Sequence, residues 1–434
     1  MNFDLQYFAE AGTLVNATGN FVNAATGETS AFDSGHSLSA ELKAFYDTEL
    51  LENARSELFY AQFAKRQPLP AHHHGSGEWR KWNTFDRAAK LTEGVIPTGQ
   101  KFGVTAVTGS VDQYGTYTAI TDKLELRAYD DVILGATEEM GASAAETQEA
   151  LIRDALFTNT NVLYCDKITR ATGAVAATPT AQSGLAEDAT YHCHLTPEMV
   201  NKAVTVMKKN RVPRINGKYF AVVHPSVAHD LRSDESWIEA HKYAAPEEIF
   251  NGEIGELHGV RFIENVFAPV LRGDNLAGST RTLSVNHQAG YSGAITSVAF
   301  DGGTVADDAL IGRTICINGV TAVVTDNTGS TLTFASTNFG SVADNAVIYP
   351  GEGAGDGVAA YATYFFGKDS FGIIDPEGGA LEMIIHDKGE IGGPLNQFST
   401  IGYKFETNGA TILYPERLLR VMSTSSFSAT DQAN

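Results

Sequence analysis

The chain has 434 residues, of which 43% are hydrophobic, and its formal net charge is −21. This length and apolar content suffice for two or three domains with packed cores, which excludes a disordered chain. The acidic surface as a whole repels a phosphate backbone, so we expect no sequence-reading nucleic-acid binding.

The lack of a recognisable targeting signal and the pattern of cysteines favour a reducing compartment. No stretch approaches the roughly 20 apolar residues of a membrane span, so no membrane partner is expected. The first residues lack the basic start and apolar run of a secretory signal peptide, which argues against export by that route. Cys165, Cys193 and Cys316 are far apart and odd in number, which argues against a disulfide framework.

The N-terminal third begins with a polar arm. Residues 1–36 are rich in Asn, Ala, Gly and Thr with little periodic apolar content, which predicts a loosely ordered arm. From Ser37 the apolar residues recur at helical spacing, and Pro68 and Pro70 end that predicted helix. Residues 71–122 then alternate apolar and polar residues between Gly and Pro turns. They predict a long two-stranded excursion with too little apolar mass for its own core.

A long helix and a mixed domain follow. Apolar or small residues recur every three or four positions from Ile133 to Leu151, which predicts a helix of about 28 residues that could serve as a spine. Beyond a Gly/Ala/Thr linker near residues 170–190, Thr196 and Pro197 predict a helix start. "KYFAVVHP" reads as a buried strand that stops at Pro225, where another helix can open.

Residues 272–357 have the pattern of a separate β-module. Their apolar runs are short and bounded by Gly, Asp or Asn, and Asn318-Gly319 predicts a type I′ hairpin turn. Long buried strands resume from Val358, and "NGATILYPERLLRVMS" predicts a final strand. The module is therefore expected to be an insertion whose two ends lie close together.

The candidate chemical sites all have a simpler structural interpretation. His72, His73 and His74 are consecutive, so neighbours on an extended chain point to opposite sides, and no other ligand type lies at metal spacing. His192 and His194 would share one face of a strand but lack a matching partner pair. The sequence contains no nucleophile elbow, phosphate-binding loop or dinucleotide fingerprint. We therefore expect no enzyme, no catalytic residue, no bound metal and no cofactor.

Three long phrases carry a family resemblance: "EWRKWNTFDRAAKLTEGVIPTGQKFGVTAVTGSVDQYGTYTAITD", "KYFAVVHPSVAHDLRSDESWIEAHKYAAPEEIFNGEIGELHGVRFIENVFAPV" and "ILYPERLLRVMS". Together with the order of the elements, they resemble the major capsid proteins of tailed phages, of the type found in podophages that infect enteric bacteria. The resemblance covers residues 38–271 and 358–423. It implies an α+β chain with the Hong Kong 97-like capsid fold and an inserted small all-β domain.

The resemblance also implies a domain plan. Its parts are an N-terminal arm and helix (1–66), an extended β-loop (67–123), a peripheral domain with the spine helix (124–189, completed by 381–434), an axial domain (190–271 and 358–380) and the inserted β-domain (272–357). The extended loop would pack over a neighbouring subunit, and aromatic and arginine side chains are the usual anchors of such interfaces. The expected contact residues are Glu78, Trp79, Arg80, Trp82, Phe85, Tyr114 and Tyr117.

The implied function is a structural subunit that assembles into the icosahedral shell around a phage double-stranded DNA genome. The expected partners are other copies as pentamers and hexamers, a portal, scaffolding or decoration proteins, and packaged DNA by non-specific proximity. The expected location is the virion capsid, after assembly in the bacterial host cytoplasm. Two alternatives are a secreted β-rich adhesin or glycan-binding protein, which should carry a signal peptide, and a metal-dependent hydrolase, whose ligands would have to converge from scattered histidines.

Overall fold

The structure is a computed structural model that describes residues 59–70, 75–82, 85, 87, 88, 90, 93, 99–121, 124, 132–241, 255–278, 280–377, 381–386 and 397–434. The predicted arm, most of the predicted first helix and the run His72–His74 lie outside these residues. The chain divides into two compact units. Unit 1 contains Met1–Leu156 and Phe371–Leu413, and unit 2 contains Phe157–Ser370 and Tyr414–Asn434.

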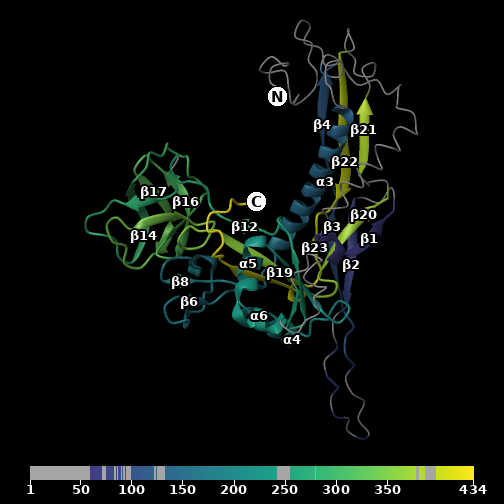
Figure 1. Cartoon of the computed structure of the whole chain (residues 1–434), viewed down its shortest axis with the longest axis horizontal. Helices are drawn as coiled ribbons and strands as arrows, with labels where there is room; N and C mark the ends of the chain where they lie inside the picture. Colours follow the sequence, from purple (N-terminus) through teal and green to yellow (C-terminus); the bar gives the residue numbers. More distant parts are fainter. Residues whose placement is uncertain are drawn as a thin grey trace. The chain divides into compact units, whose positions relative to one another are not determined.

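Unit 1 is organised around the helix α3, Val132–Phe157, which agrees with the predicted spine helix. Met140 and Ala144 on this helix are buried against Ile120, Ile401 and Phe405 of an antiparallel sheet. Figure 1 shows α3 running alongside two of its strands, β4 and β22. The sheet has the order β21-β22-β4, with bounds Glu382–His386, Phe398–Thr407 and Asp112–Thr121.

The strand β4 corrects one predicted boundary. We expected residues 71–122 to form a two-stranded excursion without a core of its own, but all ten residues of β4 pair with β22. Ile120 at its end is buried under α3. The excursion is therefore shorter than predicted, because its last strand has a partner that lies almost 300 residues later in the sequence.

A second sheet of unit 1 joins residues distant in sequence. The strand β1, Lys65–Leu69, pairs in parallel with β20, Phe371–Pro376, and β20 pairs with β23, Thr411–Ile412. Pro68 is tolerated because β1 lies at the sheet edge, where a missing N–H costs little. The sequence predicted a helix up to Pro68. This was wrong at its end, where a short 3-10 turn, Tyr60–Phe63, leads into β1.

Unit 2 contains a seven-stranded sheet with the order β10-β11-β9-β19-β24-β5, in which β12 also pairs with β19. All seven residues of β19, Ala360–Phe366, are buried between β9, Tyr219–Val223, and β24, Leu418–Ser423. The other bounds are Val162–Tyr164 for β5, Gly255–Leu257 for β10, Val260–Glu264 for β11 and Val270–Leu271 for β12.

The helices of unit 2 begin where the sequence predicted. The helix α4, Pro197–Lys209, has Thr196 as N-cap, and the Thr196 hydroxyl accepts from Met199 N at 3.4 Å. The helix α5, Pro225–Ser233, begins directly after β9, and α6 spans Glu235–His241. Among the described residues no helix is both long and apolar enough to cross a membrane.

Two parts of unit 2 differ from the predicted domain plan. The strand β24 was assigned to the peripheral domain, but it pairs with β19 over six residues and belongs to unit 2. The predicted linker near residues 170–190 contains β7, which forms a small sheet of the order β7-β6-β8 with the strands on either side of the linker. Its bounds are Lys167–Thr169 for β6, Val175–Ala177 for β7 and Tyr191–His192 for β8.

The segment 272–357 contains a closed barrel with the order β13-β14-β17-β16-β15-β18. Its strands are Leu283–Val285, Ala294–Asp301, Thr314–Ile317, Val320–Asn327, Thr331–Asn338 and Val347–Pro350 for β13 to β18. Asn318 and Gly319 have φ values of 51° and 76°, as the predicted type I′ turn requires.

The barrel has its own core and a narrow connection to the sheet. Phe300, Leu332 and Phe334 are among the side chains buried inside it. The two connecting segments are adjacent, because a Cβ on Gly353 would lie 3.3 Å from Leu271 O. The prediction that the two ends of the module lie close together is confirmed.

Candidate functional site

The hairpin of β2, Ser76–Trp82, and β3, Val104–Ser110, carries most of the predicted contact residues. Its strands pair in register from Ser76↔Ser110 to Trp82↔Val104. Side chains alternate between the two faces of a strand. In β2, Gly77 and Trp79 are buried whereas Glu78, Arg80 and Trp82 are exposed. The hairpin therefore has one face against its own chain and one face open.

The buried face corrects the expectation for Trp79. This side chain is 6% exposed, and a Cβ on Gly372 would lie 2.6 Å from its ring. Only a glycine leaves room for the indole at that point of β20. Trp79 is thus packed within its own chain, the usual alternative to an interface anchor.

The open face ends in a stack of three aromatic rings. Trp82 lies 4.5 Å from Phe102, and Phe85 lies 5.3 Å from Phe102, measured between ring centroids. The three side chains are 55%, 58% and 60% exposed in the order Trp82, Phe102 and Phe85. We call Trp82, Phe85 and Phe102 the aromatic stack. Exposed aromatic clusters of this kind mark interaction sites on soluble proteins.

The segment that carries the aromatic stack is rich in charged residues. Arg80 Nε lies 3.3 Å from Glu78 Oε1, and both side chains are about half or more exposed, so this ion pair contributes little to stability. Residues 65–101 carry seven Lys or Arg against three Asp or Glu, in a chain whose overall charge is strongly negative. The hairpin segment is therefore locally basic.

The two predicted tyrosines lie on β4 and not on the hairpin. Tyr114 stacks on Phe405 at 5.8 Å and packs against the buried cluster under α3. Tyr117 is exposed and pairs with Gly402 across the strands. The structure thus brings Glu78, Arg80, Trp82 and Phe85 onto the hairpin and places the tyrosines on the adjoining sheet of the same unit.

One histidine of the pair His192 and His194 is held by a buried carboxylate, that of Glu187. His194 Nε2 lies 2.8 Å from Glu187 Oε2, and the Thr424 hydroxyl donates to the same oxygen at 2.8 Å. Arg170 pairs with the other oxygen. Burial lowers the pKa of His192, and the neighbouring His194 lowers it further. These contacts satisfy Glu187 inside the fold, which fits the structural interpretation of the pair.

The cysteines are buried free thiols. Burial raises the pKa of Cys193 and that of Cys316 to about 11. The thiolate is the reactive form, so a raised pKa makes these thiols poor nucleophiles at neutral pH. Within the described part of the chain, no group of three or more His, Cys, Asp or Glu is arranged to hold a metal ion.

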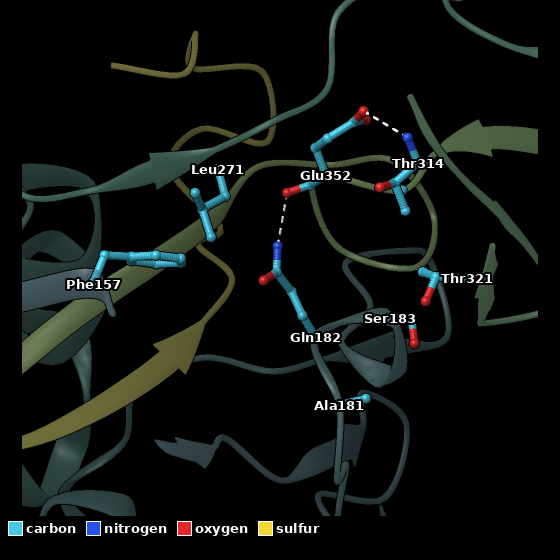
Figure 2. Close-up of a pocket in the computed structure, with 9 residues that line it drawn as sticks. Phe157, Ala181, Gln182, Ser183, Leu271, Thr314, Thr321 and Glu352 are labelled. Atoms are coloured by element: carbon cyan, nitrogen blue, oxygen red, sulfur yellow. Dashed lines mark hydrogen bonds between the residues drawn. The ribbon is translucent and has the colours of Figure 1, made fainter. Parts of the chain in front are cut away.

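A pocket of about 300 Å³ opens at the base of the barrel (Figure 2). Phe157 and Leu271 form its apolar side, and Gln182 donates through Nε2 to Glu352 O at 2.8 Å. Thr314 N donates to Glu352 Oε1 at 3.1 Å. The other side of the lining is polar and includes the hydroxyls of Ser183 and Thr321. The hydrogen bond from Gln182 connects residues 181–183 to the segment that follows the last strand of the barrel.

Sequence reasoning missed Phe102, which completes the aromatic stack. "KFG" carries one aromatic residue two positions before β3, and its pairing with Trp82 depends on the register of the hairpin. The alternation of β2 could have separated Trp79 from Trp82, because residues three apart in a strand point to opposite faces.

Comparisons with known proteins agree with the predicted resemblance. Residues 105–283 match the family described as phage capsid protein. No curated protein sequence matches the chain. The capsid of Ralstonia phage GP4 is similar at 12% identity and a TM-score of 0.51, over 97% of this chain and 100% of that one. The acid-stable capsid of Helicobacter pylori bacteriophage KHP30 is similar at 9% identity and a TM-score of 0.50, over 94% and 99%. These likenesses confirm the fold class.

Proposed function

We propose that this chain, which is similar to phage capsid proteins by family match and fold, is the major subunit of a tailed-phage head. Copies of it would assemble as pentamers and hexamers into a closed icosahedral shell around double-stranded DNA. The comparisons do not favour the alternative of a secreted adhesin or glycan-binding protein. The proposed role is structural and needs no catalytic step.

The observation that supports assembly most directly is the aromatic stack. A monomer gains nothing by leaving Trp82, Phe85 and Phe102 in water, whereas burying each ring in an interface would contribute about 2 kcal/mol. The Lys and Arg residues of the segment 65–101 are complementary to an acidic surface, and the rest of this chain is acidic. We infer that the hairpin docks on a neighbouring copy.

Such a contact is heterologous, because the hairpin meets a different patch on the next subunit. Heterologous contacts that close give rings, and rings of five and six can build a shell. The further partners in this proposal are a portal, scaffolding or decoration proteins, and packaged DNA. The proposed location is the virion capsid, after assembly in the host cytoplasm.

Electron microscopy and light scattering of the purified chain test the proposal. Closed shells or separate capsomers are the expected result. A compact monomer at every protein and salt concentration would contradict it.

A matched pair of variants tests the role of the hairpin. Phe102→Ala should prevent or weaken assembly, because it removes the central ring of the aromatic stack. Phe427→Ala removes a phenylalanine of unit 2 that is 67% exposed, against 58% for Phe102, and serves as the control. Equal effects of the two substitutions would show that the hairpin has no special role.

A further inference from the structure

A cluster of cationic side chains stands out on unit 2 of this acidic chain. Residues 208–218, "KKNRVPRINGK", carry five Lys or Arg and no Asp or Glu. They run from the last turn of α4 to the start of β9. Every one of the five cations is exposed.

The topology of the sheet adds two more cations to this cluster. The strands β9 and β24 both run antiparallel to β19, so the starts of β9 and β24 meet the end of β19. Lys368 N, just beyond β19, donates to Pro213 O at 3.0 Å. Arg417, just before β24, donates through Nη1 to Lys368 O at 3.0 Å. We call the set the basic patch: Lys208, Lys209, Arg211, Arg214, Lys218, Lys368 and Arg417.

Tight turns hold these side chains outward. Arg211 and Asn216 have φ values of 54° and 49°, and Gly217 continues the second turn at 81°. Arg214 donates to Gly217 O at 3.3 Å and lies over the ring of Tyr219, which fixes its direction. The patch therefore consists of short, backbone-supported loops and not of a long mobile tail.

Most of the positive charge in the patch has no internal partner. Lys218 pairs with Glu256, and Asp369 and Glu416 are the other carboxylates nearby in sequence. Lys208, Lys209, Arg211 and Lys368 make no side-chain hydrogen bond or ion pair with any residue that the structure describes. Among the described residues, four of the seven cations are therefore available to an external anion.

We propose that the basic patch binds the phosphate backbone of double-stranded DNA. This inference rests on the proposed function, in which the packaged genome lies next to the shell. Among the described residues, no large exposed hydrophobic side chain lies in the segments that carry the patch. Protein interfaces are depleted in lysine at their centres and enriched in aromatic residues, so a lysine-rich patch without an apolar centre fits a polyanion better than a protein.

Binding through this patch would be independent of base sequence. The cations lie on turns and at the end of a helix, and the patch contains no helix or hairpin that could enter a groove and read base edges. Contacts to phosphates release counterions, which makes affinity fall steeply with salt. This reconciles a local DNA contact with a chain that repels nucleic acid overall.

The test measures fluorescence anisotropy of two short DNA duplexes of unrelated sequence with the unassembled chain. Lys209→Gln/Lys368→Gln removes two unpaired cations from separate segments of the patch. Lys65→Gln/Lys404→Gln removes the same charge from exposed positions of unit 1 and serves as the control. Circular dichroism melts verify that each variant is folded.

We expect the wild type to bind both duplexes equally. Raising the salt from about 50 to 200 mM should weaken the binding of both proteins, but less for the patch variant. The two losses of affinity should differ by a factor on the order of ten, as expected for two missing phosphate contacts. The control variant should keep the wild-type salt dependence. Equal losses in the two variants, or no binding by the wild type at low salt, would overturn the proposal.

Three further outcomes distinguish DNA binding by the patch from a contact of the patch with another copy and from the proposed function. A patch variant that binds DNA normally but no longer assembles would show that the patch faces an acidic surface of another copy, which overturns the DNA proposal. Shell formation is scored independently by electron microscopy. A wild type that forms shells without binding DNA contradicts the DNA proposal alone, and one that binds DNA without ever assembling contradicts the proposed function alone.

Discussion

The inserted barrel and the β2–β3 hairpin are both β-structures within a mixed α/β chain, but they differ in how far their apolar residues are buried. The barrel closes on itself and buries Phe300, Leu332 and Phe334 in its own core. The hairpin has two strands, which cannot enclose a core, so it buries Trp79 against its parent unit and leaves the aromatic stack exposed. A closed module can stand alone, whereas an open hairpin needs a neighbour.

The strongest test of this contrast is Phe334→Ala in the barrel. Phe334 is buried and meets Phe339 edge to face at 5.3 Å between centroids. Its loss should lower the free energy of unfolding of the barrel by about 3–5 kcal/mol. Hydrogen exchange of the amides of β14 to β17 measures this. The amides of unit 1 should keep their protection, and a loss of protection there would show that the barrel is not an independent module.

A comparable loss is expected in the hairpin for Trp79→Ala, about 3 kcal/mol in the unassembled subunit. The ring fills the space above Gly372, and its Nε1 has no hydrogen-bond partner, so the contact is apolar. Thermal unfolding of the unassembled chain measures the effect. If the unassembled chain is unaffected and assembly is lost, Trp79 is an interface anchor after all.

Trp82→Ala should show the opposite division of effects. The exposed ring contributes little to the unassembled chain, where we expect a change below about 0.5 kcal/mol. In the assembled state, the loss should be about 2 kcal/mol per contact. Denaturant unfolding and the critical concentration for assembly measure the two quantities. Destabilisation of the unassembled subunit to the extent seen for Trp79→Ala would remove the distinction between the two faces.

The smallest expected effect is a pH dependence of the contact between the segment that carries Asp431 and the start of the inserted segment at Arg272. Burial opposes ionisation of Asp431, but donors from Ser428, Tyr361 and Ser226 outweigh it and lower its pKa. A carboxyl whose folded pKa is lowered stabilises the fold above its unfolded pKa and loses this contribution as pH falls. The neighbouring Thr430 carbonyl accepts from Arg272 at the start of the inserted segment.

Asp431→Asn should therefore weaken this connection at neutral pH, and the difference from the wild type should be smaller near pH 3, because the carboxyl protonates as pH falls toward its lowered folded pKa. Protection of the Ala359 amide, which donates to Ala429 O, reports the state of the segment. The apolar contact between Trp79 and Gly372 contains no titrating group and should not respond. The same wild-type-to-variant difference at both pH values would contradict the role of Asp431.

Local signals explain what could be predicted from the sequence. The helices α3 and α4, the strand β9 and the turn at Asn318-Gly319 each depend on neighbouring residues, and the structure has them where the pattern indicates. The extent of the β-module was visible because its turns recur at short intervals.

Non-local pairing explains what could not be predicted. The helical pattern before Pro68 gave way to β1, because β20 offers a parallel partner far along the chain. Trp79 is buried because a glycine happens to lie opposite, which no local window shows. Five cations of the basic patch form a visible run, but Lys368 and Arg417 join it through the antiparallel arrangement of β9, β19 and β24.

The position of β24 in its sheet has a consequence for biosynthesis. This strand lies between β19 and β5, although it is translated after every other strand of that sheet. The ribosome therefore releases β5, β9 and β19 before the strand that joins β19 to β5 exists. Long-range pairing of this kind is slow and leaves partly folded chains exposed to aggregation. The seven-stranded sheet of unit 2 can therefore be completed only after β24 has been synthesised.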